Sequence, residues 1–234
     1  MSVQARIRRW LWRLFLIPLG GMLLYQSWIF GHVVYWNTHD PATSAFMRNR
    51  LEEARENGSQ ARLHLQWIPY ERISSHLKRA VVAAEDDRFM MHEGFDYDAM
   101  RRAHERNLKA GRLVAGGSTI SQQLAKNLFL SASRTPWRKA QEAVITLMLE
   151  GVMSKRRILE IYLNVIEWGD GVFGAEAAMR HYYGISADSA GMEQAARLAA
   201  MIPDPRYHDR HRDTAGLKRK MRAILARMAA ARIP

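Results

Sequence analysis

Apolar side chains recur at helical spacing along most of the chain after residue 62, and this pattern predicts a mainly α-helical domain. No run of alternating apolar and polar residues rich in β-branched side chains is present, so the sequence does not predict a large sheet. One apolar stripe predicts a helix that ends near Glu85, with Ser74 or Ser75 as its N-cap. The stripe consists of Ile73, Leu77, Val81 and Ala84.

A second helix is predicted after a pair of glycines, Gly116 and Gly117. Thr119 and Gln122 have the spacing of a capping box, in which each residue satisfies a backbone N–H of the other. The apolar residues of this helix fall on one face, whereas Gln123 and Lys126 lie off that face.

Two more helices carry start or periodicity signals. Thr135-Pro136 is a cap followed by proline at the first helical position. Near the C-terminus an amphipathic stripe is formed by Leu217, Met221, Ile224, Leu225 and Met228. A shorter helix is expected around residues 46–55, within a polar segment.

A charge-free apolar segment covers residues 14–34 and matches the ~20 residues that span a hydrocarbon core of about 30 Å. Arginines precede it, and residues 35–46 contain no Lys or Arg, so the positive-inside rule places the N-terminus in the cytoplasm. A cleaved signal peptide and a buried core helix are the alternatives. The expected organisation is a cytoplasmic N-terminus (1–13), a transmembrane anchor (14–34), a linker with a short helix (35–61) and one external domain (62–234).

Composition adds a constraint on the binding partner. The 234 residues carry a net charge of +12, which indicates a polyanionic partner such as nucleic acid, anionic lipid headgroups or a phosphorylated substrate. A domain outside the cell membrane disfavours nucleic acid. The chain has no cysteine, which excludes disulfides, thiolate metal sites and cysteine nucleophiles.

The densest polar cluster, residues 84–96, directly follows the helix that ends near Glu85. A carboxylate there meets the negative end of the helix dipole, and with partial burial its pKa should rise. A raised pKa suits a general base. The alternative is a solvated helix end followed by a turn at Gly94.

The second polar cluster, residues 116–127, opens a helix whose unpaired N–H groups favour anions. It lacks the Gly-Lys-Ser/Thr ending of a P-loop, so the usual nucleotide motifs are not supported. An ordinary capped helix is the alternative. Positive side chains nevertheless follow closely, spaced so that they can surround a diphosphate, with Glu142 among them. They are Lys126, Arg134, Arg138 and Lys139.

Together these stretches resemble the peptidoglycan glycosyltransferase family, which occurs in bifunctional penicillin-binding proteins and in monofunctional transglycosylases. The resemblance runs from about residue 66 to about residue 228. It is carried by Glu85-Asp86 with Phe89, His92 and Gly94-Phe95-Asp96; Gly116-Gly117-Ser118-Thr119 with Gln122-Gln123-Leu124-Ala125-Lys126-Asn127; Arg138-Lys139 with Glu142-Ala143; and Tyr162-Leu163-Asn164 with Tyr182-Tyr183-Gly184. Ser121 stands where the family more often has threonine. No transpeptidase domain follows Pro234, which implies the monofunctional form.

The resemblance implies a lysozyme-like helical fold and the polymerisation of lipid II into β-1,4-linked glycan, with inversion at the anomeric carbon and release of undecaprenyl diphosphate. It makes Glu85 the general base and Glu142 a second catalytic glutamate that orients basic groups, while Lys126 and Arg134 neutralise the diphosphate. The implied substrate-binding residues are Ser118, Thr119, Gln122, Gln123, Lys126, Arg134, Arg138 and Lys139.

The same resemblance implies an inner-membrane protein with a periplasmic catalytic domain. Its expected partners are lipid II, the growing glycan strand, membrane lipids and other cell-wall synthesis and division proteins, with no nucleic acid. We expect no tightly bound metal, although a divalent cation, Mg²⁺ or Mn²⁺, is expected to assist the diphosphate. The two alternatives are a lysozyme-like hydrolase, which has no use for the basic cluster, and a non-enzymatic binding module, which predicts a dispensable Glu85.

Overall fold

The computed structural model describes residues 3–58, 63–112, 114, 116–133 and 135–234. The α-helices are α1 (Val3–Trp36), α2 (Ala45–Glu56), α3 (Ser75–Glu85), α4 (Tyr97–Ala110), α5 (Ile120–Phe129), α6 (Pro136–Val152), α7 (Lys155–Val165), α8 (Ala175–Tyr183), α9 (Met192–Met201), α10 (Pro205–Arg210) and α11 (Ala215–Met228). Short 3₁₀ turns lie at Tyr70–Arg72, Phe89–Met91 and Ala187–Ser189. The prediction of a mainly helical protein is confirmed.

The predicted helix starts are confirmed by their caps. The Ser74 side chain accepts from the backbone N–H of His76, so Ser74 and not Ser75 caps α3. At α5 the Thr119 side chain accepts from the Gln122 N–H at 3.2 Å, and Gln122 Oε1 accepts from the Thr119 N–H at 3.0 Å. Thr135 caps α6, with proline in the first turn.

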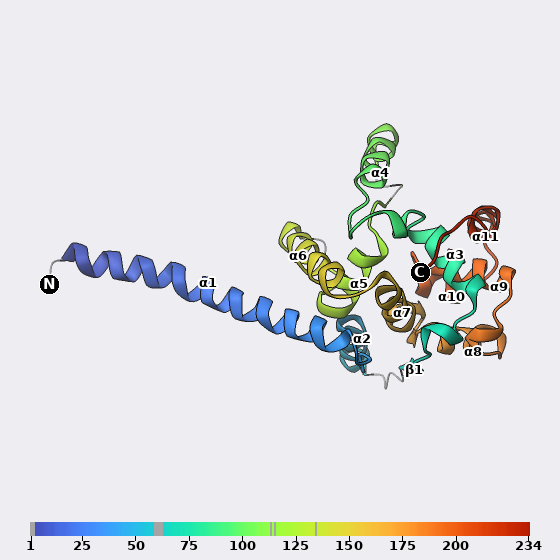
Figure 1. Cartoon of the computed structure of the whole chain (residues 1–234), viewed down its shortest axis with the longest axis horizontal. Coiled ribbons are helices and arrows are strands. Elements are labelled where there is room, and N and C mark those ends of the chain that lie inside the picture. Colours follow the sequence, from blue (N-terminus) through green and yellow to red (C-terminus); the bar gives the residue numbers. More distant parts are fainter. Residues whose placement is uncertain (1–2, 59–62, 113, 115, 134) are drawn as a thin grey trace.

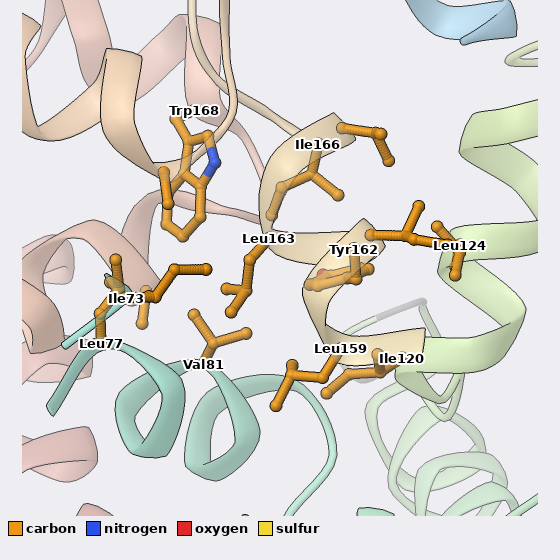
Figure 2. Close-up of a cluster of buried hydrophobic side chains, with 14 of the residues drawn as sticks. Ile73, Leu77, Val81, Ile120, Leu124, Leu159, Tyr162, Leu163, Ile166 and Trp168 are labelled. Atoms are coloured by element: carbon orange, nitrogen blue, oxygen red, sulfur yellow. The ribbon is translucent and has the colours of Figure 1, made fainter. Parts of the chain in front are cut away.

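Helix α7 forms the centre of the core, between α3 on one side and α5 on the other (Figure 2). Its Leu159, Tyr162 and Leu163 are fully buried, and each apolar side chain buried in this way stabilises the fold by about 1.5–3 kcal/mol. The facing side chains on α3 include Leu77 and Val81. This packing places the C-terminal end of α3 beside α5.

A small three-stranded sheet, with strand order β1-β3-β2, lies beside the helices. It is built from β1 (His64–Leu65), β2 (Glu167–Gly169) and β3 (Val172–Phe173), and β1 is parallel to β3 whereas β2 is antiparallel to it. Strands of two or three residues are too short to show an alternating pattern, which is why the sequence does not predict them. Gly174 follows with φ +85°, and a Cβ there would lie 2.8 Å from the Asn164 carbonyl oxygen.

Helix α2, the helix expected within the 35–61 linker, is present and packs against α5. Its Met47 is buried, and its Arg50 forms an ion pair with Glu167 of β2, with a closest distance of 2.8 Å. The polar appearance of this segment in the sequence hides these contacts. Helix α2 is therefore part of the folded domain, while residues 59–62 lie outside the described residues.

Helix α1 extends from the domain as a long arm (Figure 1). Its C-terminal part packs on the domain, where Ile29 and Val33 are fully buried. Its N-terminal part carries large exposed apolar side chains, among them Leu16, Ile17, Leu23 and Leu24. Among the described residues, no helix combines the length and the apolarity needed to cross a membrane.

Candidate active site

Glu85 is the last residue of α3, where the core packing holds it against α5. Its Oε2 accepts a hydrogen bond of 2.7 Å from Gln123 Nε2. Burial raises the pKa of Glu85, an effect that outweighs the hydrogen bond from Gln123 and the positive charges of Lys220 and Lys126. The raised pKa agrees with the sequence-based expectation, with burial as its main cause. Glu85 therefore holds a proton more readily than an ordinary glutamate.

Tyr162 of α7 fixes the orientation of the Gln123 side chain. The Tyr162 hydroxyl donates to Gln123 Oε1 at 2.9 Å, so the amide nitrogen is directed to Glu85. Burial raises the pKa of Tyr162 well above its ordinary value, and the negative charges of Glu85 and Asp86 raise it further. The hydroxyl therefore stays protonated and remains a donor. Its hydrogen bond orients the Gln123 amide, which in turn donates to the Glu85 carboxylate.

Asp86 joins the end of α3 to the start of α5. Its Oδ2 accepts from the backbone N–H of Ile120 at 3.0 Å, and its Oδ1 lies 2.9 Å from His92 Nε2. Thr119 adds a bond of 2.7 Å from its hydroxyl to the Gly94 carbonyl oxygen. These bonds explain why the two polar clusters of the sequence lie together.

Glu142 lies at the centre of a basic cluster on α6. It is 3% exposed, and its carboxylate accepts from both Arg138 and Lys139. Lys139 Nζ also lies 3.4 Å from the Ser118 hydroxyl, which links the cluster to the loop before α5. The prediction that Glu142 sits among basic side chains is confirmed for Arg138 and Lys139. A buried carboxylate paired in this way holds both cations in place.

A pocket of about 420 Å³ opens next to Gln123 and is called the cation pocket here. Among the described residues that line it, four are cationic and two are acidic, so positive charge is in excess. The cationic residues are Arg50, Lys126, Arg138 and Arg206, and the acidic ones are Glu167 and Asp204. The Phe46 ring lies on the same wall, with its centroid 5.1 Å from Lys126 Nζ.

A second pocket, of about 540 Å³, is lined by Glu85 and is called the Glu85 pocket. Its charged lining residues are of both signs: Arg102, Arg106 and Arg227 are basic, and Glu85, Asp86, Asp87 and Glu105 are acidic. Gln123 lines the cation pocket and donates to Glu85, so this one amide lies between the two pockets. A carboxylate with a raised pKa and a pocket lined by more cationic than acidic side chains are thus placed on the two sides of a single side chain.

The predicted binding residues differ in their placement. Gln123, Lys126 and Arg138 line the cation pocket, and Ser118 and Lys139 belong to the basic cluster beside it. Thr119 and Gln122 are each 2% exposed and hold the start of α5, so their contact with a substrate stays a prediction. Arg134 lies outside the described residues.

Three residues of the site were not predicted from the sequence. Tyr162 belongs to a motif that the sequence analysis noted but gave no role. Phe46 and Arg50 reach the cation pocket from α2, and they lie 74 and 70 residues before the start of α5 in the chain. A short amphipathic pattern indicates the helix but not the element against which it packs.

Metal-binding side chains do not gather in the described part of the chain. Within residues 3–58, 63–112, 114, 116–133 and 135–234, no group of three or more His, Cys, Asp or Glu side chains is arranged to hold a metal ion. The positive charges that face the cation pocket come from arginine and lysine side chains, a type of group that binds phosphate oxygens through charge-assisted hydrogen bonds.

Comparison with known proteins gives matches over nearly the whole chain. The Transglycosylase family model matches residues 52–229, a range that begins inside α2. The biosynthetic peptidoglycan transglycosylase of Nitrosospira multiformis is 66% identical over 97% of this chain and 99% of its own length. The proteins of the same name from Methylobacillus flagellatus and Laribacter hongkongensis are 62% and 58% identical, each over 97% of this chain and 100% and 99% of their own lengths.

Proposed function

The chain belongs to the transglycosylase family, and we propose that it is a peptidoglycan glycosyltransferase that polymerises lipid II into β-1,4-linked glycan strands. The observation that carries the proposal is the arrangement around Gln123. A partly buried carboxylate with a raised pKa lies on one side of this amide, and a pocket lined by more cationic than acidic side chains lies on the other. Glycosyl transfer from a diphosphate donor needs both groups close together.

In the proposed reaction Glu85 accepts the proton of the acceptor 4-hydroxyl while that oxygen attacks the anomeric carbon of the donor. The new C–O bond forms as the bond from the anomeric carbon to the diphosphate oxygen breaks, and the diphosphate leaves with the electron pair. Attack from the face opposite the leaving group inverts the anomeric centre, so no covalent sugar–enzyme intermediate is required. The acceptor enters through the Glu85 pocket and the diphosphate occupies the cation pocket.

The basic side chains act on the leaving group. Lys126 and Arg138 contact the diphosphate, whose charge grows as the bond breaks, so they stabilise the transition state more than the bound substrate. Glu142 acts through Arg138 and Lys139, which it holds in place. Arg134 and Ser118 complete this set. A Mg²⁺ or Mn²⁺ ion bound to the diphosphate oxygens of the donor would supply further positive charge.

The test of the function uses purified full-length protein, fluorescent lipid II, detergent and Mg²⁺, with products separated by length. We expect polymer that lysozyme digests into short fragments. The hydrolase alternative predicts that lipid II is left unchanged while preformed glycan strands are shortened. That result would overturn the proposal, because the cation pocket has no role in cutting a glycan that carries no diphosphate.

We further propose that α1 is a single-pass anchor in the bacterial inner membrane, with its N-terminus in the cytoplasm and the catalytic domain in the periplasm. The charge-free residues 14–34, the arginines before them and the exposed apolar side chains on the projecting part of α1 support this proposal. An anchor of this kind keeps both pockets beside the lipid-linked donor. Other cell-wall synthesis and division proteins are the proposed partners at this location.

Replacing Leu23→Glu and Leu24→Glu together is expected to move the protein from the membrane fraction to the soluble fraction after alkaline carbonate extraction. Each charge near the centre of a spanning helix costs about 2.5–3.5 kcal/mol of insertion free energy. Both side chains are exposed and make no core contact, so the domain should stay folded. The control is Met192→Glu, an exposed apolar position on α9. Release of the unmodified protein by carbonate would contradict the spanning anchor.

A further inference from the structure

A third pocket, of about 410 Å³, lies between α1 and the segment that joins α5 to α6, and we call it the α1–α6 pocket. Its large lining side chains are Met22 and Tyr25 from α1, Phe129 and Leu130 from the end of α5, and Trp137 from α6. Arg138 is the one charged residue among the described residues that line it. The lining is therefore mainly apolar, with a single positive group at one boundary.

The α1–α6 pocket adjoins the cation pocket. Ser133 and Arg138 line both. Arg138 is also held by Glu142, so its position at this boundary is fixed. An apolar site thus begins at the residue where the site for negative charge ends.

The wall that α1 contributes is held firmly to the domain. Gln26 donates a hydrogen bond to Gln141 of α6. Trp28 and Trp36 pack against Phe129, with ring centroids 6.5 and 5.2 Å apart. These contacts lie close to Met22 and Tyr25 along α1. The contacts of Gln26 and Trp28 therefore join the α1 wall of the pocket to α6 and to the end of α5.

Three side chains that line the α1–α6 pocket are exposed although they are large and apolar. Tyr25 and Met22 are each 41% exposed, and Trp137 is 62% exposed. Apolar side chains gathered around a concave site favour an apolar ligand, because a ligand that fills the site gains packing contacts with them. The volume lies within the range of about 300–1,000 Å³ that is usual for ligand pockets.

We infer that the α1–α6 pocket binds the first isoprene units of the donor's polyprenyl chain while the diphosphate lies in the cation pocket. The inference rests on the proposed function, because it needs a polyprenyl diphosphate donor. Such a donor carries an apolar branched chain directly on a diphosphate. It therefore requires an apolar site that touches an anion site, and the two pockets meet at Arg138 in that way. Recognition of the donor thus extends beyond its charged head to the start of its tail.

The kinetic test compares two disaccharide-pentapeptide diphosphate donors, one with a single isoprene unit and one with four, added to full-length protein in the same detergent. We expect the unmodified protein to have a lower KM for the longer tail. In the double variant Tyr25→Ala, Trp137→Ala, the ratio of the KM for the short tail to the KM for the long tail should fall about tenfold. Its kcat should change little, because apolar contact area is removed from the tail site only. Leu147→Ala, at an exposed apolar position of α6 outside the pocket, is the matched control.

A labelling test adds a readout that does not depend on turnover. A donor with a diazirine on its second isoprene unit is irradiated with the protein, and labelled peptides are identified by mass spectrometry. Labels at Met22, Tyr25, Leu130 or Trp137 support the inference. Labels confined to other surfaces overturn the inference. A competition experiment can also overturn it: a photoreactive phospholipid labels the same residues, and added polyprenyl diphosphate does not reduce that labelling.

The outcomes separate the inference from the function on which it rests. If the unmodified protein polymerises neither donor, the proposed function fails. If it polymerises both and the double variant keeps the full preference for the longer tail, the tail site is wrong and the polymerase function stands.

Discussion

Glu85→Gln is expected to lower the rate of lipid II polymerisation by about 10²- to 10⁴-fold, the usual contribution of a general base. Glutamine has nearly the same shape and its amide oxygen still accepts the hydrogen bond from Gln123, but it cannot take up the proton of the acceptor hydroxyl. The measurement is kcat with fluorescent lipid II. Glu93→Gln, an exposed glutamate in the same polar cluster, is the control and should keep full activity. Polymerisation at the normal rate by Glu85→Gln would show that Glu85 is not the general base.

The same variant is expected to be more thermally stable at neutral pH. Because burial raises the pKa of folded Glu85 above its ordinary value of 4.5, the folded state binds this proton more tightly than the unfolded state. The resulting stabilisation is fully present below pH 4.5 and is lost as the pH rises through the folded pKa. Glutamine never acquires the charge that burial disfavours. The gain in Tm should therefore appear at pH 7 and disappear below pH 4.5.

The helices around the site could be predicted from the sequence because their signals are local. A cap at Ser74, a capping box at Thr119 and Gln122, and a cap followed by proline at Thr135 each act within one turn of helix. The sequence also predicts the raised pKa of Glu85, from its place at the negative end of the helix dipole together with partial burial. Local patterns were sufficient for these features.

The rest of the site depends on contacts between distant parts of the chain. The hydrogen bonds that join Tyr162, Gln123 and Glu85 connect three helices, and no spacing in the sequence indicates that the Gln123 amide lies between two pockets. Helix α2 looks like a polar linker because Arg50, one of its charged residues, is paired with Glu167 across 117 positions. When a charged side chain is buried by pairing with a residue far away in the chain, the pattern of apolar residues in the sequence does not show it.

Lys126→Met is expected to lower kcat by about 10²- to 10³-fold, the effect of removing one group that stabilises developing charge in a transition state. Lys126 lines the cation pocket, and methionine keeps a long apolar side chain that can still contact the Phe46 ring. Lys126→Arg should retain part of the activity, because it keeps the positive charge but presents it in a different geometry. Lys109→Met, at an exposed position of α4, is the control.

A second readout separates loss of charge from loss of fold. The positive charge of Lys126 lowers the pKa of Glu85, so its removal should raise that pKa further. Because Glu85 acts as a base only when ionised, activity on the acid side of the pH profile should then be lost at a higher pH than in the unmodified protein. A merely misfolded variant would lose kcat without moving this limb. If kcat falls and the acid limb of the pH profile stays in place, Lys126 does not act electrostatically at this site. If kcat falls and the acid limb moves to higher pH, Lys126 stabilises the leaving group and also lowers the pKa of the base, Glu85, on the other side of Gln123.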